Sequence, residues 1–151
     1  MTCVCWFVLW ITQRWLDLRK NNMTDAKLRL INSSASIPLS HAVVAAGLVH
    51  VSGQVGFKPG TTELVSDDLA EQCRQTLANV DAQLQAAGTQ RDRIIKCNIY
   101  LKDVKAGFAV MNECYAAWLG DHRPARTTVG AQMALDTILV EVDCVALASN
   151  A

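Results

Sequence analysis

A strand-like segment near the C-terminus, apolar at every second residue, constrains the fold of this chain more than any other feature. Side chains of a β-strand alternate between two faces, so a strand over residues 138–148 would have one uninterrupted apolar face. That face comprises Ile138, Val140, Val142, Cys144, Ala146 and Ala148. Glu141 and Asp143 fall on the opposite face, which therefore has to meet solvent, a ligand or another subunit.

A second strand-like segment lies just before it. Over residues 125–131 the same alternation places Arg126, Thr128 and Gly130 on one face. Arg126 contributes a cation, and Glu141 follows it fifteen residues later with a carboxylate. We expect both side chains to point away from the apolar core. The pairing indicates a small anionic ligand and a positioned water molecule.

Composition and charge exclude several classes of function. The chain has 151 residues, enough for one domain, and its 14 Lys and Arg balance 14 Asp and Glu. Nucleic-acid phosphates call for clustered basic residues, so this balance argues against RNA or DNA as a partner. The six cysteines include no Cys-x-x-Cys pair, and the three histidines show no metal-ligand spacing, so no metal is predicted. Mostly apolar surroundings suggest buried free thiols, which favours a reducing, cytoplasmic location.

The first 22 residues differ in composition from the rest, and we treat them as an extension to a single domain over residues 23–151. Their apolar run, Cys3 to Ile11, is shorter than the roughly 20 residues that cross a bilayer, so no membrane span is predicted. The segment also lacks the basic region and cleavage site of a secretory signal. Two interpretations stay open. The start site was assigned upstream of Met23, or the segment is a disordered or amphipathic membrane-surface element.

Hydrophobic periodicity divides the remaining chain into short strands and two helices. Strands are predicted at residues 28–31, 42–46 and 48–52, the last two forming a hairpin around Gly47. A helix capped by Ser66 or Asp68 is predicted next. Its apolar stripe consists of Leu69, Cys73, Leu77, Val80, Leu84 and Ala87.

A further strand and helix complete the pattern. Residues 94–101 are predicted to be a strand, and the helix after Asp103 carries a stripe that we expect in the core: Phe108, Met111, Tyr115 and Trp118. The order β-β-β-α-β-α-β-β predicts an α+β fold with two helices packed on one face of a mixed sheet. The other face is predicted to pack against copies of the chain, with pockets at the subunit seams.

Several segments, in this order along the chain, resemble the RidA/YjgF family of reactive-intermediate deaminases: Val51-Ser52-Gly53-Gln54-Val55, Asn79-Val80, Asn112 with Tyr115, Pro124-Ala125-Arg126 and Val140-Glu141-Val142. The resemblance covers roughly residues 36–148. It implies a chorismate-mutase-like fold and a homotrimeric barrel with ligand clefts between subunits. It also implies hydrolysis of 2-imino and enamine acids, such as 2-iminopropanoate, to 2-oxo acids and ammonia, with no cofactor and no metal.

The resemblance also assigns roles to individual residues. Arg126 matches the arginine that binds the substrate carboxylate, which suits a guanidinium because it forms two parallel hydrogen bonds to such a group. Glu141 matches the glutamate that positions water at the imine carbon. Gly53 and Asn112 match further substrate-binding positions. Structural alternatives stay open: an ion pair for Arg126, an interface ion pair for Glu141, and a bulge or turn at Gly53.

Two substrate-binding positions depart from the family pattern. Leu39 stands where the family has a tyrosine, and Thr128 stands where many members have a cysteine. Thr128 keeps a hydroxyl that can bond a ligand or water. The departures leave two alternatives to the deaminase. One is a non-catalytic trimer that binds a small carboxylate, and the other is the endoribonuclease or translation-inhibitor activity attributed to some relatives.

Overall fold

The computed structural model describes residues 28–34 and 36–149, so the predictions for residues 1–22 fall outside the described residues. Within these described residues the fold consists of six strands and two long helices. In chain order they are β1 (Arg29–Ser33), β2 (Ser40–Ala45), β3 (Leu48–Val55), α2 (Leu69–Ala86), β4 (Ile94–Leu101), α3 (Val104–Leu119), β5 (Ala125–Gly130) and β6 (Val140–Leu147), with a short 3-10 helix, Arg91–Arg93, before β4.

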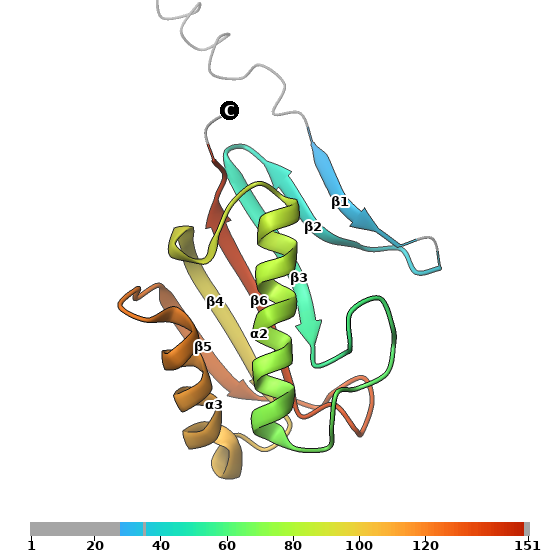
Figure 1. The fold of residues 1–151 in the computed structure, drawn as a ribbon, viewed down its shortest axis with the longest axis vertical. Helices are drawn as coiled ribbons and strands as arrows, with labels where there is room; N and C mark the ends of the chain where they lie inside the picture. The colour runs from blue at the N-terminus through green and yellow to red at the C-terminus, as the bar shows by residue number, and fades with distance from the viewer. Residues whose placement is uncertain (1–27, 35, 150–151) are drawn as a thin grey trace, which may run out of the picture.

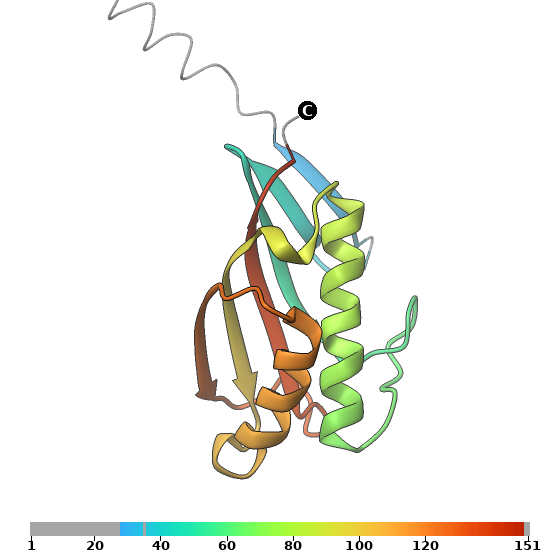
Figure 2. The same cartoon turned by 60° about the vertical axis from the view of Figure 1, so that its left-hand side comes forward.

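All six strands belong to one sheet with the order β1-β2-β3-β6-β4-β5. Neighbouring strands are antiparallel except β4 and β5, which run parallel. Both helices lie in front of this sheet in Figure 1, and the turned view in Figure 2 places them on the same side of it. The predicted α+β fold, with two helices on one face of a mixed sheet, is confirmed.

Helix α2 forms where the sequence predicted it. The Asp68 carboxylate accepts a hydrogen bond from the Glu71 amide at 2.9 Å and so satisfies one free N–H of the first turn. The stripe facing the sheet is buried, with Val80 and Leu84 fully covered. Gly88 adopts a φ of +82° just beyond the helix, a backbone conformation that glycine reaches without steric strain.

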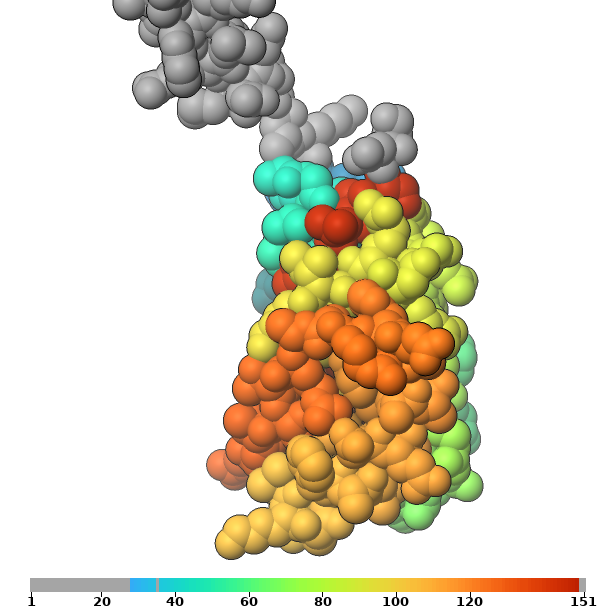
Figure 3. Space-filling view, turned by 90° about the vertical axis from the view of Figure 1, so that its left-hand side faces the viewer, coloured from blue at the N-terminus to red at the C-terminus, as the bar shows by residue number. Residues whose placement is uncertain are grey.

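Helix α3 confirms most of its predicted stripe but not its first member. Met111 and Tyr115 are buried and Trp118 is half-buried, whereas the Phe108 side chain is 44% exposed. The prediction of a core position for Phe108 is wrong because α3 packs over β4 and the edge strand β5, and no strand lies beyond β5. Figure 3 shows this side of the molecule, with α3 and β5 next to each other at the surface.

The described cysteines are free thiols. Three of them are buried and one is half-buried: Cys73, Cys97 and Cys144, and Cys114 respectively. Burial raises the pKa of the Cys73 thiol to about 12, which keeps it protonated and unreactive. The prediction of mostly buried free thiols is confirmed for these four residues.

Strands β2 and β3 form the predicted hairpin through a two-residue turn. Ala45 pairs with Leu48, and the intervening Ala46 and Gly47 have φ values of +50° and +78°. Positive φ at both central residues is the requirement of a type I′ turn, whose twist matches the strands. Gly47 meets this requirement freely, but the Cβ of Ala46 is strained there by roughly 1–2 kcal/mol.

Ala46→Asn is therefore expected to stabilise the protein by about 0.5–1 kcal/mol, because asparagine tolerates the left-handed region better and Asn-Gly is a favoured type I′ sequence. Urea denaturation measures the change in the free energy of unfolding. Gly47→Ala serves as the control and should destabilise the protein. An unchanged or lower unfolding midpoint for Ala46→Asn would contradict the turn assignment.

Candidate functional site

A bulge in β3 shapes the centre of the sheet. Val51 pairs with Cys144 and Gln54 with Val142, so Ser52 and Gly53 together oppose the single residue Asp143. The bulge alternative for Gly53 is therefore confirmed. The end of the strand is held by α2, where the Asn79 amide donates to the carbonyl oxygens of Val55 and Phe57 at 2.8 and 2.9 Å.

Glu141 of β6 lies on the face of the sheet away from the helices. Its neighbours Val140 and Val142 are buried beneath the helices, while Glu141 itself is half-buried on the other side. It pairs with Tyr100 of β4 and Val55 of β3. The described residues include no helix on this face, which we call the open face (Figure 2).

Gly53 leaves the space that the Glu141 carboxylate occupies. A Cβ atom at Gly53 would lie 1.9 Å from Oε1 of Glu141 and 2.8 Å from its Cδ. Any side chain at this position would therefore displace the carboxylate. The structure brings together these two sequence-predicted site residues, and the need for glycine comes from this close approach.

Three polar residues beside Glu141 were missed as candidate site residues. Asp143 accepts hydrogen bonds at both oxygens, from Asn98 Nδ2 at 2.9 Å and from the Tyr100 hydroxyl at 3.1 Å. We call Asn98, Tyr100 and Asp143 the Asp143 cluster. The alternation of polar and apolar residues in β4 places Asn98 and Tyr100 on one face, and that was the available signal.

The surroundings of Glu141 make it a stronger base than an ordinary carboxylate. Burial raises the pKa of Glu141, and the negative charge of Asp143 raises it further. Among the described residues, no side chain donates a hydrogen bond to the Glu141 carboxylate. Glu141 is thus positioned to accept a proton from a water molecule at the open face.

Arg126 of β5 lies apart from Glu141, against residues of α3. Its Nη1 donates to Asn112 Oδ1 at 2.9 Å, and its guanidinium carbon lies 5.1 Å from the Tyr115 ring centre and 5.8 Å from that of Phe108. These rings and the amide orient the guanidinium. Within the described residues Arg126 forms no ion pair, so its charge is available to an anion. Asn112 and Arg126 were both predicted site residues, and the structure brings them together.

Thr128 lies on the same face of β5 as Arg126, because the two residues are two positions apart in the strand. Arg126 pairs with Cys97 of β4, and Thr128 pairs with Ile99. Its hydroxyl oxygen is buried and has no hydrogen-bond partner in the described part of the chain. A buried hydroxyl without a partner is unfavourable by roughly 1–3 kcal/mol. A ligand oxygen bound at Arg126 could supply the missing partner.

The expectation that Arg126 and Glu141 both point away from the core is wrong. Arg126 pairs with Cys97, which is buried beneath the helices, so Arg126 lies on the helix side, whereas Glu141 lies on the open face. A polar residue is tolerated on the helix side because β5 is an edge strand that α3 covers only in part. Since β4 separates β5 from β6, the two residues are also two strand spacings, about 10 Å, apart across the sheet.

Leu39 lies far from Arg126 within one chain. It directly precedes β2 and is 38% exposed. Three strands, β3, β6 and β4, separate β2 from β5 in the sheet. One copy of the chain therefore does not bring Leu39 next to Arg126.

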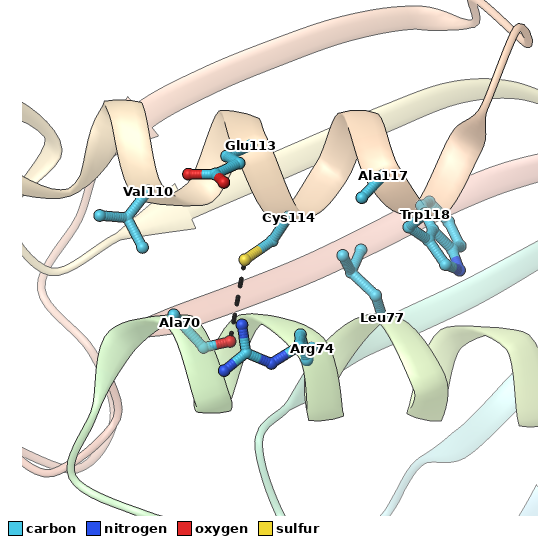
Figure 4. A pocket seen from close by; sticks show the side chains of 8 residues that line it. All are labelled: Ala70, Arg74, Leu77, Val110, Glu113, Cys114, Ala117 and Trp118. Atoms are coloured by element: carbon cyan, nitrogen blue, oxygen red, sulfur yellow. Dashed lines mark hydrogen bonds between the residues drawn. The ribbon is translucent and has the colours of Figure 1, made fainter.

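A groove of about 320 Å³ runs between α2 and α3 on the outer surface (Figure 4). Arg74 of α2 and Glu113 of α3 lie toward one end of it, and Leu77 and Trp118 toward the other. The groove contains none of the sequence-predicted site residues. Over residues 28–34 and 36–149, no group of three or more His, Cys, Asp or Glu side chains could hold a metal, and no helix is long and apolar enough to cross a membrane.

Comparison with known proteins identifies the family of this chain. Residues 31–148 match the family model described as Endoribonuclease L-PSP. The chain belongs to the RidA/YjgF family. A RutC family protein of Pyrococcus horikoshii is 38% identical over 109 residues, which are 72% of this chain and 86% of that protein. The mitochondrial protein mmf2 of Schizosaccharomyces pombe is 38% identical over 127 residues, 82% of this chain and 98% of that protein.

Solved structures agree with the family assignment. The crystal structure of RidA from an Antarctic Psychrobacter is 33% identical, with a TM-score of 0.69, and the match covers 76% of this chain and 91% of that one. The identification of this chain as a RidA/YjgF member, made on the segments around Gly53, Arg126 and Glu141, is confirmed.

The raised pKa of Glu141 makes stability depend on pH in this RidA/YjgF member. The unfolded chain releases this proton more readily than the folded one, so stability is lost as the pH rises through the folded-state pKa. The glutamine side chain of Glu141→Gln does not ionise, so this variant avoids the loss of stability at high pH. Its melting temperature should exceed that of the wild type at about pH 8, and the difference should vanish at about pH 4.

Scanning calorimetry at both pH values measures this difference. Glu113→Gln, which removes an exposed carboxylate of α3, is the matched control and should show no such dependence. A Glu141→Gln difference that stays constant between the two pH values would contradict the proposed environment of Glu141.

Proposed function

We propose that this protein is a hydrolase that converts 2-imino acids and their enamine tautomers to 2-oxo acids and ammonia, and that it acts as a homotrimer. The observation that carries the proposal is the pair of half-sites on opposite faces of one sheet. Arg126 offers a cation without an ion-pair partner in the described residues, and Glu141 offers a carboxylate with a raised pKa. Family membership supports the same chemistry.

Arg126 would bind the substrate carboxylate. Asn112 engages one guanidinium nitrogen, Nη1, and no other side chain in the described part of the chain bonds the guanidinium, so further N–H groups can form parallel hydrogen bonds to a carboxylate. The Phe108 and Tyr115 rings flank the guanidinium and would contact a small apolar substrate side chain. The Thr128 hydroxyl replaces the cysteine of many relatives and would bond a carboxylate oxygen or water.

Glu141 would move the protons of the reaction. It accepts a proton as water adds to the carbon of the protonated imine, which gives a neutral carbinolamine with a hydroxyl and an amino group on the same carbon. The protonated Glu141 then returns that proton to the nitrogen. The carbon–nitrogen bond breaks with its electron pair leaving on ammonia, and the hydroxyl proton passes to Glu141 and then to solvent as the carbonyl forms. One water is consumed and one ammonia is released, with no change of oxidation state and no cofactor.

Two copies of the chain would be needed to complete the cleft. Arg126 belongs to the edge strand β5, whose outer backbone groups have no strand partner in the described residues, and Glu141 lies on the open face. Both features favour binding to another copy. In the proposed trimer, the β5 edge of one copy meets the open face of the next, so that Arg126 and Glu141 converge from different chains.

Arg126→Ala is expected to lower kcat/KM for 2-oxo acid release by about 100-fold or more, because the substrate carboxylate loses a charge-assisted bidentate contact. The assay generates the imino acid in situ with an amino-acid oxidase and follows the oxo acid. Arg123→Ala is the matched control, since Arg123 bonds only backbone carbonyls of residues 120 and 122. An unchanged kcat/KM in a folded Arg126→Ala protein would contradict the proposed role of Arg126 in binding the substrate carboxylate.

Mixed oligomers test whether the cleft is shared between chains. Arg126→Ala and Glu141→Gln chains are each expected to be inactive alone, but refolding an equal mixture should restore about one quarter of the wild-type activity. That fraction of clefts receives both intact residues when the chains mix at random. Each variant refolded alone is the control. Absence of recovery in verified mixed oligomers would contradict a shared cleft.

A non-catalytic carboxylate-binding protein is the second candidate, favoured by Leu39 and Thr128 at positions where the family has other residues. Calorimetric binding of a 2-oxo acid without turnover of the imino acid would select it. The family model carries an endoribonuclease description, but the zero net charge of this chain supplies no basic surface for RNA. Free thiols at the described cysteines support a reducing, cytoplasmic location for the protein.

A further inference from the structure

The Asp143 cluster lies directly beside Glu141. Asn98 holds Oδ1 of Asp143 and the Tyr100 hydroxyl holds Oδ2, so rotation of this carboxylate would break at least one hydrogen bond. Hydrogen bonds to a charged acceptor are roughly twice as strong as neutral ones. The cluster therefore fixes one negative charge at a defined place on the open face.

The strand register places this fixed charge next to Glu141. Asp143 and Glu141 are two residues apart on the same face of β6. Tyr100 is the cross-strand partner of Glu141, yet its hydroxyl bonds Asp143, so its side chain leans along the strands from one carboxylate toward the other. Neighbours in this diagonal relation lie within about 7–8 Å of one another.

Other charged groups on the open face are directed elsewhere or lie farther along the sheet. Lys96 of β4 donates to the Thr127 hydroxyl of β5, which turns it away from β6. His50 of β3 pairs with Val145, beyond Asp143 from Glu141, and His41 belongs to β2. On β3, the residues opposite Glu141 and Asp143 are uncharged: Ser52, Gly53 and Val55. Asp143 is therefore the charged neighbour that acts most directly on Glu141.

We propose that Asp143 is a positioning residue that, held by Asn98 and Tyr100, keeps a negative charge beside Glu141 and so strengthens Glu141 as the acceptor of a proton from water. The inference rests on the proposed function, since it concerns the same hydrolytic step. Environments that differentiate two neighbouring carboxylates commonly divide acid–base roles between them. Asp143 has both oxygens occupied by donors, whereas Glu141 has none in the described residues and is free to exchange its proton.

The pKa shifts of Glu141 and Tyr100 agree with this division of roles, in which Glu141 exchanges a proton and Asp143 keeps its charge. Burial raises the pKa of Glu141 first, and the charge of Asp143 adds to the effect. Burial also raises the pKa of Tyr100, and its hydrogen bond to Asp143 raises it further, so the phenol stays a proton-bearing donor. Leu39 has no hydroxyl to contribute to the proposed cleft. Tyr100, the cross-strand partner of Glu141, does carry one.

Asp143→Asn tests the proposal because it removes the charge while nearly keeping the shape. The acidic limb of the kcat/KM profile should move to lower pH, because loss of the neighbouring negative charge makes Glu141 release its proton more readily. Asp143→Glu retains the charge and should keep the limb near its wild-type position. Asp67→Asn, which removes an exposed loop carboxylate, is the matched control.

A direct titration separates this inference from the proposed function. Carbon-13 NMR of carboxyl-labelled glutamate, with the Glu141 signal assigned through Glu141→Gln, gives the titration midpoint of Glu141 whether or not the protein turns over substrate. The midpoint should fall in Asp143→Asn, because the neighbouring negative charge is lost. If the wild-type protein releases no oxo acid, the proposed function is overturned, but the role of Asp143 is not.

An unchanged Glu141 midpoint in Asp143→Asn would overturn the role of Asp143 alone. Loss of activity at every pH with an unmoved limb would also overturn it, because that pattern indicates a purely structural residue. If Asp143→Asn fails to fold, Tyr100→Phe removes one of the two donors and should move the midpoint in the same direction by a smaller amount. No movement in a folded Tyr100→Phe protein would count against the cluster.

Discussion

One uncovered sheet face is the constraint on which the rest of this structure depends. The central strands β3, β6 and β4 bury Val142 and Cys144 beneath the helices, and strand alternation then directs Glu141 and Asp143 to the opposite side. Both helices of the described chain pack on the same face (Figure 2), so the polar face has no cover of its own among those residues. An open face and an edge strand are features through which one chain can bind another, and the shared cleft proposed above would use both.

The chemistry of the site depends on small departures from regular strand geometry. A bulge sets Ser52 and Gly53 against Asp143, and the missing side chain of Gly53 leaves room for the Glu141 carboxylate. Half-buried and next to a fixed negative charge, this carboxylate binds its proton more tightly than one in water. The same surroundings that would make Glu141 a useful base in the proposed reaction oppose its ionisation in the folded protein, so the proposed function and stability conflict at this position.

Much of the fold could be predicted because it follows from local patterns. The α2 stripe, the Asp68 cap and the alternation in β6 each depend on residues close in sequence, and the structure contains all three. Phe108 and Arg126 could not be placed in the same way. Both lie on the helix side of the sheet edge, and whether a position is covered there depends on which strand ends the sheet, a matter of strand order that no local spacing records.

The sequence by itself determined the elements, the apolar face of each and the residues most suited to bind an anion and direct water. Periodicity and residue chemistry are local properties, so they can be obtained without coordinates. Only the tertiary structure decided that Arg126 and Glu141 lie on opposite faces, that Gly53 makes room for Glu141, and that Asn98 and Tyr100 fix Asp143. These relations arise from strand register and from pairing between distant segments, which bring residues together by geometry rather than by their spacing in the chain.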